Sequence, residues 1–412
     1  MVQKIKNLFY GWWIVLTSFI LLFLTGGTAL YGFTAFFNPI SSEMKWGSAA
    51  ISFAFSLRSV EGGVLQPVIG IFVERIGVRK CIVLGLALMG FSFFLLSRMT
   101  TITVFYTGFL MLSLGFSMAA GIPQYTAIAN WFKKRRSLAF GLLTTGFGAS
   151  GLLTPVIALT IRSVGWRETM FLLGPIILAI GIPLSFVIRD QPQSYGTQAD
   201  GVITAKNLPD VPAFQEEKEF TLKECLKTKT FWLLLLYTFC VQFAFSTIPV
   251  QLMSHLINVG ISEKLAALTM AGYSLTSLVG RLFISWLGDT YSKKRLLMIS
   301  ATMQAFGFFI YANIGSAWMI IPFIILYGPG FGATVPLLPG IQADYFGVRS
   351  FASIRGMMSI AFAVPGVVAP VFAGWIFDLY HSYTIAFQIY AALAALSIVV
   401  LMRIPNKKYQ SE

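Results

Sequence analysis

The chain has 412 residues, of which 56% are hydrophobic and only 11% are charged. About a quarter of the residues of a soluble globular protein are charged, so this composition excludes a soluble domain and indicates a membrane protein. The formal net charge of +14 could suggest nucleic acid. The placement of the basic residues instead indicates membrane orientation, with no nucleic-acid partner.

Long apolar stretches recur along the chain, and each is near the roughly 20 residues that a helix needs to cross the hydrocarbon core of a bilayer. Backbone groups cannot stay unpaired in lipid, and solid apolar runs lack the alternation of barrel strands. We therefore expect an all-α membrane protein with twelve transmembrane helices. In chain order, these are predicted at 9–37, 48–73, 81–97, 104–129, 138–161, 168–188, 231–255, 265–287, 296–313, 318–342, 356–378 and 383–402.

A polar segment, residues 189–230, separates six predicted spans from the other six. We interpret this segment as a cytoplasmic linker between an N-terminal six-helix bundle, 1–188, and a C-terminal six-helix bundle, 231–412. Its last part, 221–229, is predicted to form a short amphipathic helix at the membrane surface.

Twelve spans place both termini on the same side of the membrane. We assign 23 of the 30 basic residues to that side, five to the other side, and Arg58 and Arg281 to the spans themselves. The positive-inside rule therefore predicts that both termini are cytoplasmic.

The two halves share a loop pattern. The segment "GIFVERIGVRK" (70–80) after the second span aligns with "SWLGDTYSKKR" (285–295) after the eighth, at an offset of 215. Aromatic pairs at 131–132 and 345–346, after the fourth and tenth spans, match at an offset of 214. An internal repeat in a polytopic membrane protein is typical of transporters whose two bundles rock around a site near the midplane.

Three segments also resemble known families. The loop after the second span resembles the signature loop of the major facilitator superfamily. The residues that carry this resemblance are Gly70, Glu74, Arg75, Gly77, Arg79 and Lys80, with Glu74 where that family usually has aspartate. The segment "NWFKKRRSLAFGLLTTGFGASG" resembles a signature of monocarboxylate transporters, and "YGFTAFFNPISSEM" is similar to a segment of bacterial oxalate/formate antiporters. The resemblance implies an organic-anion carrier with the major facilitator fold, expected to function as a monomer.

Arg281 lies eight residues before Asp289, which puts it roughly 12 Å inside the eighth span. A charge at such depth is costly and usually faces a cavity or a partner. Its planar guanidinium matches a carboxylate. In both related families an arginine in this span binds the anion, so the resemblance implies that Arg281 is the anion receptor. The alternative is a permanent ion pair that only locks two helices together.

Other positions narrow the substrate. The resemblance puts Phe362 where the oxalate antiporter has a second basic residue, so a short monocarboxylate such as lactate or pyruvate is expected at a site that includes Phe362. Tyr31 in the first span, and Tyr327 with Phe331 in the tenth, are expected to line the same cavity. Each of these aromatic residues could equally serve helix packing.

Glu61 is the only carboxylate deep in a predicted span, which makes it the candidate proton carrier. Arg58 lies one turn away and is its nearest basic partner, so a fixed Arg58–Glu61 pair at an external gate is the alternative. Proton-coupled animal monocarboxylate carriers use an acidic residue and a lysine where this chain has Ser277 and, approximately, Ala35. Whether Glu61 or the substrate handles the proton therefore stays open.

Two charged loops are predicted to gate the cytoplasmic side. Their residues can form ion pairs between elements in the outward-open state and lose them when the bundles rock; they are Glu74, Arg75, Arg79, Asp289 and Asp344. Charges that are simply solvated are the alternative. His255 and His381 are predicted to be interfacial bystanders.

The sequence contains no nucleotide-binding loop, metal cluster or nucleophile–base pattern, so neither an enzyme nor an ATP-driven pump is expected. The three cysteines are expected to be buried thiols, and no cofactor is expected. We predict a secondary transporter of small monocarboxylates, coupled to protons and working by alternating access in the plasma membrane of a prokaryote. The alternatives are an organic-anion antiporter of the oxalate/formate type and a signalling receptor. Drug efflux is disfavoured because an arginine selects anions.

Overall fold

The computed structural model describes residues 9–201 and 219–405, and within these ranges the chain forms helices and no strand. Eleven helical segments of the described chain are long and apolar enough to cross a membrane. A further long helix, α4 (Ser48–Ile76), has 29 residues. With α4, these segments correspond to the twelve predicted spans. The predicted all-α membrane fold is confirmed.

The described chain divides into two compact units. Unit 1 runs to Glu219 and also takes in Phe346–Met357, whereas unit 2 comprises Phe220–Tyr345 and the residues from Met358 onward. The division after Glu219 falls within the segment 189–230. Residues 202–218, in the middle of that predicted linker, lie outside the described residues.

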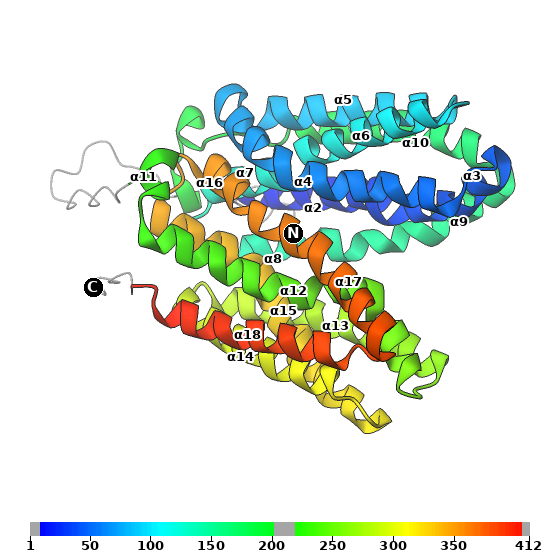
Figure 1. Cartoon of the computed structure of the whole chain (residues 1–412). Coiled ribbons are helices and arrows are strands. Elements are labelled where there is room, and N and C mark those ends of the chain that lie inside the picture. The colour runs from blue at the N-terminus through cyan, green and yellow to red at the C-terminus, as the bar shows by residue number, and fades with distance from the viewer. Residues whose placement is uncertain (1–8, 202–218, 406–412) are drawn as a thin grey trace, which may run out of the picture. The chain divides into compact units, whose positions relative to one another are not determined.

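In unit 1, α2 packs against α8, while α5 packs against both α6 and α10 (Figure 1). Three spans are interrupted: the first by two short irregular helices, the fourth after α6, and the fifth by a 3₁₀ turn. The elements are α2 (Gly11–Gly26), η1 (Gly27–Tyr31), η2 (Gly32–Phe36), α3 (Phe37–Met44), α4, α5 (Val78–Ser97), α6 (Ile102–Ala119), α7 (Ile122–Trp131), α8 (Arg136–Ala149), η3 (Ser150–Leu152), α9 (Leu153–Val164), α10 (Trp166–Ser185), η4 (Gln193–Tyr195), η5 (Ala199–Gly201) and most of α16 (Phe351–Met358).

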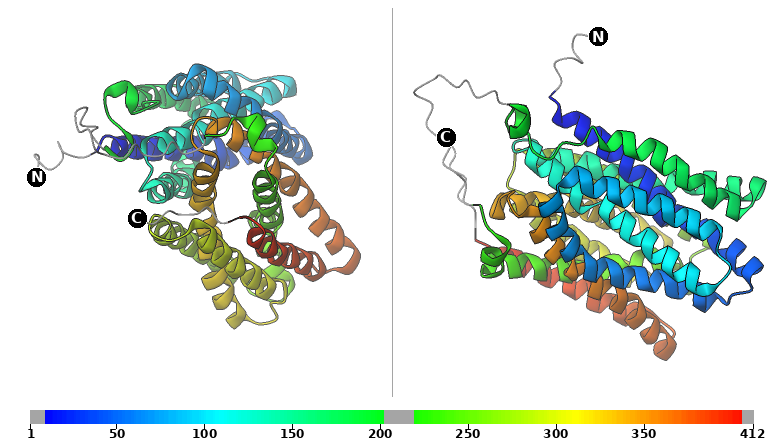
Figure 2. Two further views of the ribbon diagram at one scale, coloured as in Figure 1. Left: turned by 90° about the vertical axis from the view of Figure 1, so that its left-hand side faces the viewer. Right: turned by 90° about the horizontal axis from the view of Figure 1, so that it is seen from above.

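In unit 2, α12 packs against α17 and α18, and α14 packs against α18. In each unit, therefore, the first of its six spans packs against the fifth, and the third packs against the sixth. The repeat in the sequence is thus matched by a repeat in helix packing. Figure 2 shows the helices of each unit nearly end on in its left view. The elements are α11 (Leu222–Leu226), α12 (Lys229–Asn258), α13 (Glu263–Leu287), α14 (Lys293–Ala312), η6 (Ala317–Met319), α15 (Ile320–Phe346), α17 (Ile360–Tyr380) and α18 (Thr384–Met402).

The chain that follows α10 folds back onto unit 1. The indole Nε1 of Trp131 donates to the carbonyl of Arg189 at 2.9 Å, and the Lys134 amide donates to Asp200 Oδ2 at 2.7 Å. The Arg189 guanidinium lies 4.0 Å from the centre of the Tyr10 ring. The first part of the segment 189–230 is therefore packed against unit 1 through hydrogen bonds and a cation–π contact.

The predicted helix at 221–229 forms as α11, which is shorter than expected. Thr221 and Glu224 form a reciprocal capping box at its start. This box satisfies two backbone donors that a helix N-terminus leaves unpaired. α11 ends at Leu226, and α12 begins at Lys229 after a second cap from Thr228.

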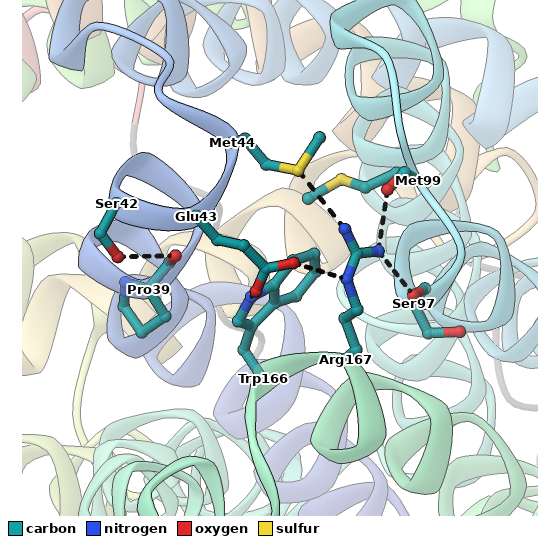
Figure 3. A network of polar contacts seen from close by, with 8 residues as sticks. All are labelled: Pro39, Ser42, Glu43, Met44, Ser97, Met99, Trp166 and Arg167. Atoms are coloured by element: carbon teal, nitrogen blue, oxygen red, sulfur yellow. Dashed lines mark hydrogen bonds and ion pairs between the residues drawn. The ribbon is translucent and has the colours of Figure 1, made fainter.

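One end of unit 1 is joined by a polar network around Arg167 (Figure 3). The Arg167 Nε donates to Glu43 Oε1 at 2.9 Å, and its Nη1 donates to the carbonyls of Ser97 at 3.2 Å and Met99 at 2.8 Å. The Trp166 indole donates to the other oxygen of Glu43 at 2.6 Å. One guanidinium thus connects the ends of α3, α5 and α10.

Candidate functional site

Arg281 lies on a buried polar face of α13. Four-residue spacing places side chains one above another on a helix. The buried residues at that spacing are Thr269, Tyr273, Ser277, Arg281 and Ser285. The Ser285 hydroxyl donates to the carbonyl of Arg281 one turn earlier. The sequence therefore gives α13 a polar stripe that faces the interior of unit 2.

The backbones of α13 and α15 touch beside Arg281. A Cβ on Gly280 would collide with the backbone of Pro329, and a Cβ on Gly332 would collide with the carbonyl of Ser277. The Thr276 hydroxyl also donates to the Ile324 carbonyl at 3.0 Å. Because no side chain separates the two helices here, the position of Arg281 is fixed against α15.

Aromatic rings from three helices gather next to this stripe. Tyr273 stacks on Tyr327 with ring centres 5.8 Å apart, and Phe331 lies 6.3 Å from Tyr273. On its other side Phe331 stacks on Phe245 of α12 at 4.2 Å. Unit 2 therefore brings Tyr327 and Phe331 together with the polar stripe that carries Arg281. Tyr327 is fully buried in the hydrophobic core of unit 2, so in this conformation it contributes to packing.

Sequence reasoning missed Tyr273 and Phe245. Tyr273 lies eight residues before Arg281, so its helical spacing could have placed it on the same face. Phe245 belongs to another helix and stacks on Phe331 only in the folded unit. No local pattern marks it among the many phenylalanines of the chain.

Polar side chains hold the turn of α15 that precedes Phe331. The Gly330 carbonyl accepts from the hydroxyl of Ser300 at 2.8 Å and from the amide of Gln304 at 3.3 Å. The Gln304 amide also donates to the Thr334 hydroxyl at 2.9 Å. α15 contains three internal prolines, each of which removes a backbone donor from the helix. These side-chain bonds tie the proline-rich helix to α14.

Phe362 and His255, the other unit 2 residues considered, differ in burial. Phe362 lies in the first turn of α17 and is 40% exposed. His255 is completely buried in α12, with its Nε2 3.0 Å from the Tyr311 carbonyl and its ring 5.0 Å from that of Phe387. The prediction of an interfacial His255 is wrong, because α12 continues to Asn258 and α14 and α18 cover that end of the helix.

Arg58 and Glu61 lie on α4 in unit 1, each with further polar partners. Arg58 Nη1 donates to the Ala29 carbonyl at 2.8 Å, and its guanidinium lies 5.1 Å from the centre of the Phe116 ring. Glu61 is buried and its Oε2 accepts a hydrogen bond from the Ser113 hydroxyl. Arg58 and Glu61 are close enough that an ionised Glu61 would attract the guanidinium. Arg58 therefore contacts the first and fourth spans, and Glu61 contacts the fourth.

The first span is irregular where Arg58 meets it. α2 ends at Gly26, and η1 is a π-helical turn followed by the 3₁₀ turn η2. A Cβ on Gly27 would crowd the carbonyl of Ser150 at 2.8 Å, which shows that this turn packs closely against η3. Tyr31 ends the π turn, is 39% exposed, and lies 5.7 Å from the ring of Phe147.

Among the predicted gating residues, Glu74 contacts the start of α16. Its Oε1 accepts from the Ser353 amide at 2.9 Å, so a carboxylate lies at the positive end of a helix dipole. The guanidinium of Arg355 in α16 lies 3.9 Å from the centre of the Tyr125 ring. These contacts attach α16 to α4 and α7 within unit 1.

The other predicted gating residues have different surroundings. Arg79 donates from Nε to the Ile188 carbonyl at 2.8 Å and from its amide to Asp190 at 3.1 Å. Asp344 forms an ion pair with Lys293 at 2.6 Å. Arg75 lies in the last turn of α4, and Asp289 follows α13. Their role in gating stays a prediction.

No group of three or more histidine, cysteine or acidic side chains that could hold a metal ion occurs within residues 9–201 and 219–405. The cysteines Cys81, Cys225 and Cys240 are free and buried. Burial raises the pKa of the Cys225 thiol to about 12.

Known proteins resemble this chain over nearly its full length. Monocarboxylate transporter 12 of Mus musculus is 24% identical over 419 residues, which cover 95% of this chain and 85% of the relative. Monocarboxylate transporter 13 of Rattus norvegicus is 24% identical and covers 96% of this chain and 89% of the relative. The uncharacterized MFS-type transporter YcxA of Bacillus subtilis (strain 168) is 24% identical, with 94% of each chain covered.

Solved structures share the fold. The transporter FucP in its outward conformation superposes with a TM-score of 0.71 at 15% identity, covering 96% of this chain and 99% of FucP. The human organic anion transporter MFSD10 gives a TM-score of 0.69 at 13% identity, with 95% and 99% covered. The sequence profile of the Major Facilitator Superfamily matches residues 15–259 and 252–412. The chain therefore belongs to the Major Facilitator Superfamily and is a multi-pass membrane transporter.

Proposed function

We propose that this transporter carries small monocarboxylates such as lactate or pyruvate by alternating access, with Arg281 binding the carboxylate. The observation that supports this most is the buried arginine on the polar face of α13, beside the rings of Tyr273, Tyr327 and Phe331. Two of the relatives are named monocarboxylate transporters at 24% identity. The substrate class in their names, monocarboxylates, is the one that a single buried arginine favours.

A guanidinium offers two parallel N–H donors to one carboxylate, and such charge-assisted bonds are about twice as strong as neutral ones. An aromatic wall suits the short apolar part of lactate or pyruvate. The resemblance to oxalate antiporters puts Phe362 at the position of their second cation. One cation and one apolar wall favour a substrate with a single carboxylate.

Glu61 is our candidate for the proton carrier, because it is a buried carboxylate on α4 next to Arg58. We further propose that the protein acts as a monomer in the plasma membrane of a prokaryote. Both termini are proposed to be cytoplasmic, because most basic residues then lie inside.

Exchange of organic anions is the second candidate, and Ser277 favours it. This residue is buried one turn before Arg281 on the same face of α13, where proton-coupled animal carriers have a carboxylate. Without an acidic group there, charge balance could come from a second anion moving the other way. The exchanged substrate would then replace the proton.

Uptake of labelled lactate and pyruvate into proteoliposomes tests the proposal. An imposed pH gradient should drive uptake into empty vesicles if the protein is a proton symporter, whereas a requirement for preloaded anion indicates exchange. Arg281→Ala should abolish both modes, and the exposed Arg162→Ala should leave both intact. Absence of either mode for every small monocarboxylate would contradict the proposal.

A further inference from the structure

Arg58 completes an irregular backbone in the first span. In a π turn each amide reaches back five residues instead of four, so the carbonyls do not follow the regular helical ladder. One carbonyl of η1, that of Ala29, accepts the 2.8 Å hydrogen bond from Arg58 Nη1. Tyr31, a candidate substrate residue, ends the same turn two residues later. A side chain of α4 thus stabilises the turn that carries Tyr31.

Ser113 holds one oxygen of the Glu61 carboxyl group. The hydroxyl donates to Oε2, while no hydrogen bond to the buried Oε1 is formed among the described residues, and the Ser117 hydroxyl is a further, weaker polar neighbour of the carboxyl group. Glu61 as a whole is only 8% exposed. A buried carboxyl oxygen without a donor is costly when the group is ionised, so Oε1 is an open position for a proton or for a cationic donor.

Arg58 is the charged group that acts on Glu61. The fourth span offers hydroxyls, those of Ser113 and Ser117, and η1 offers the Ala29 carbonyl. Tyr106 of α6 lies seven residues before Ser113, which corresponds to about 10 Å along the helix.

Besides Tyr31 at the end of η1, further titratable groups lie on elements packed against α4. They are Glu43 in the last turn of α3, Arg79, Lys80 and Cys81 in the first turn of α5, Tyr125 in the first turn of α7, and Arg355 in α16. Glu61 sits in the middle of α4, so Arg58 is its charged neighbour at that level.

We infer that Arg58 and Ser113 are positioning residues that couple the proton on Glu61 to the backbone of the first span; this rests on the proposed role of Glu61 in transport. With Glu61 neutral, Arg58 bonds to the Ala29 carbonyl, as it does in the structure. When Glu61 loses its proton, the carboxylate attracts the guanidinium to Oε1, because a charge-assisted bond is stronger than one to a neutral carbonyl. The π turn then loses its donor and can rearrange around Tyr31.

The test measures the first span directly and uses no substrate. Thr34 in η2 and Ser163 at the end of α9 are both exposed, so each is replaced by cysteine in a separate protein. The labelling rate with a membrane-impermeant maleimide is then followed from about pH 5.5 to about 8.5. The ratio of the two rates removes the rise in reactivity that both thiols share as the pH increases, and the Glu61→Gln background shows any difference that is left. The three natural cysteines are buried, and the protein without an added cysteine gives the background.

We expect the Thr34→Cys to Ser163→Cys ratio to change at least threefold along one titration. Glu61→Gln and Arg58→Gln should flatten this curve. If Arg58→Gln does not fold, Arg58→Lys should keep a titration of reduced amplitude. Ser113→Ala should move the midpoint to higher pH by about one unit, because the ionised carboxylate loses its donor. Ser113→Thr should restore the midpoint.

Ser92→Ala is the matched control, since Ser92 is a fully buried serine of unit 1 that bonds only to the Leu88 carbonyl of its own helix among the described contacts. It should leave the midpoint unchanged. A flat ratio in the parent protein, or an unaltered titration in Glu61→Gln or Ser113→Ala, would overturn the inference. Monocarboxylate uptake is measured separately, so failure of the proposed function is distinguishable from failure of this coupling.

Discussion

Tyr273 and Arg281 lie two turns apart on the same buried face of α13, and the ring of Tyr273 stacks on that of Tyr327 at 5.8 Å. This relationship joins the charged and the aromatic parts of the candidate site within one unit. It also makes the site depend on the contact between α13 and α15. The predictions for unit 2 follow from this contact.

Gly332→Ala should weaken the α13–α15 contact, because the added Cβ would collide with the Ser277 carbonyl. Overpacking of this kind costs about 1–3 kcal/mol, so the melting temperature should fall and carboxylate binding should weaken. Gly366→Ala is the control, since a Cβ there meets open space. Equal melting curves for the two variants would show that the contact is not tight.

Phe331→Ala should change substrate size preference. It removes the ring that stacks on Phe245 and lies near Tyr273, so the space beside Arg281 becomes larger. We expect KM for lactate to rise about tenfold, which corresponds to a loss of roughly 1.4 kcal/mol of binding free energy. Longer 2-oxo acids should instead be transported with a lower KM than in the parent protein. Competition uptake assays check this, with the exposed Phe309→Ala as control. Unchanged selectivity would remove Phe331 from the site.

Arg167→Gln should lower the stability of unit 1. It removes the bonds to Glu43 and to the carbonyls of Ser97 and Met99. Because Arg167 is about a third exposed, we expect a cost of about 1–2 kcal/mol. Arg162→Gln, a change at an exposed arginine on α9, should leave the melting temperature unaltered. Similar melting of both variants would argue against the network.

Glu61→Gln should abolish uptake driven by a pH gradient and leave exchange between preloaded anion and external anion largely intact. The amide keeps the shape of the side chain and can still accept from Ser113, but it cannot carry a proton. Parallel gradient and exchange assays on the same vesicles measure this. Gradient-driven uptake at the parental rate would exclude Glu61 as the proton carrier.

The helices were predictable because apolar composition and length decide what can lie in lipid. Their interruptions were harder to predict. The fourth predicted span, 104–129, breaks between α6 and α7 at Gly121, which has φ of +70°. The π turn at Gly27–Tyr31 packs closely against η3, and a periodic pattern does not report such packing.

Within the candidate site, Arg281 was predictable because a charge inside an apolar span is conspicuous. The contact of Arg58 with Ala29 was not, because the sequence suggested Glu61 as its nearest partner and gave no sign of an irregular carbonyl. Phe245 and Ser113 were missed for a similar reason. Each is an ordinary residue of an apolar helix, and its importance comes from a neighbour on another helix.

The role of Arg281 is tested most directly by ligand-induced thermal shift on the purified protein. Melting is measured with and without lactate or pyruvate for the parent, Arg281→Lys and Arg281→Ala. Bound ligand stabilises the folded state by mass action. Lysine keeps the charge but lacks the planar arrangement of donors, so Arg281→Lys should show a smaller ligand-induced rise in melting temperature than the parent. Arg281→Ala should show no rise.

Melting without ligand separates a receptor from a structural lock. Removing one member of a buried ion pair costs about 3–5 kcal/mol, so a lock predicts that Arg281→Ala melts far earlier than the parent even without ligand. Our account predicts near-parental melting without ligand and a lost carboxylate shift in Arg281→Ala. A folded Arg281→Ala protein that still gave the parental shift with monocarboxylates would contradict it.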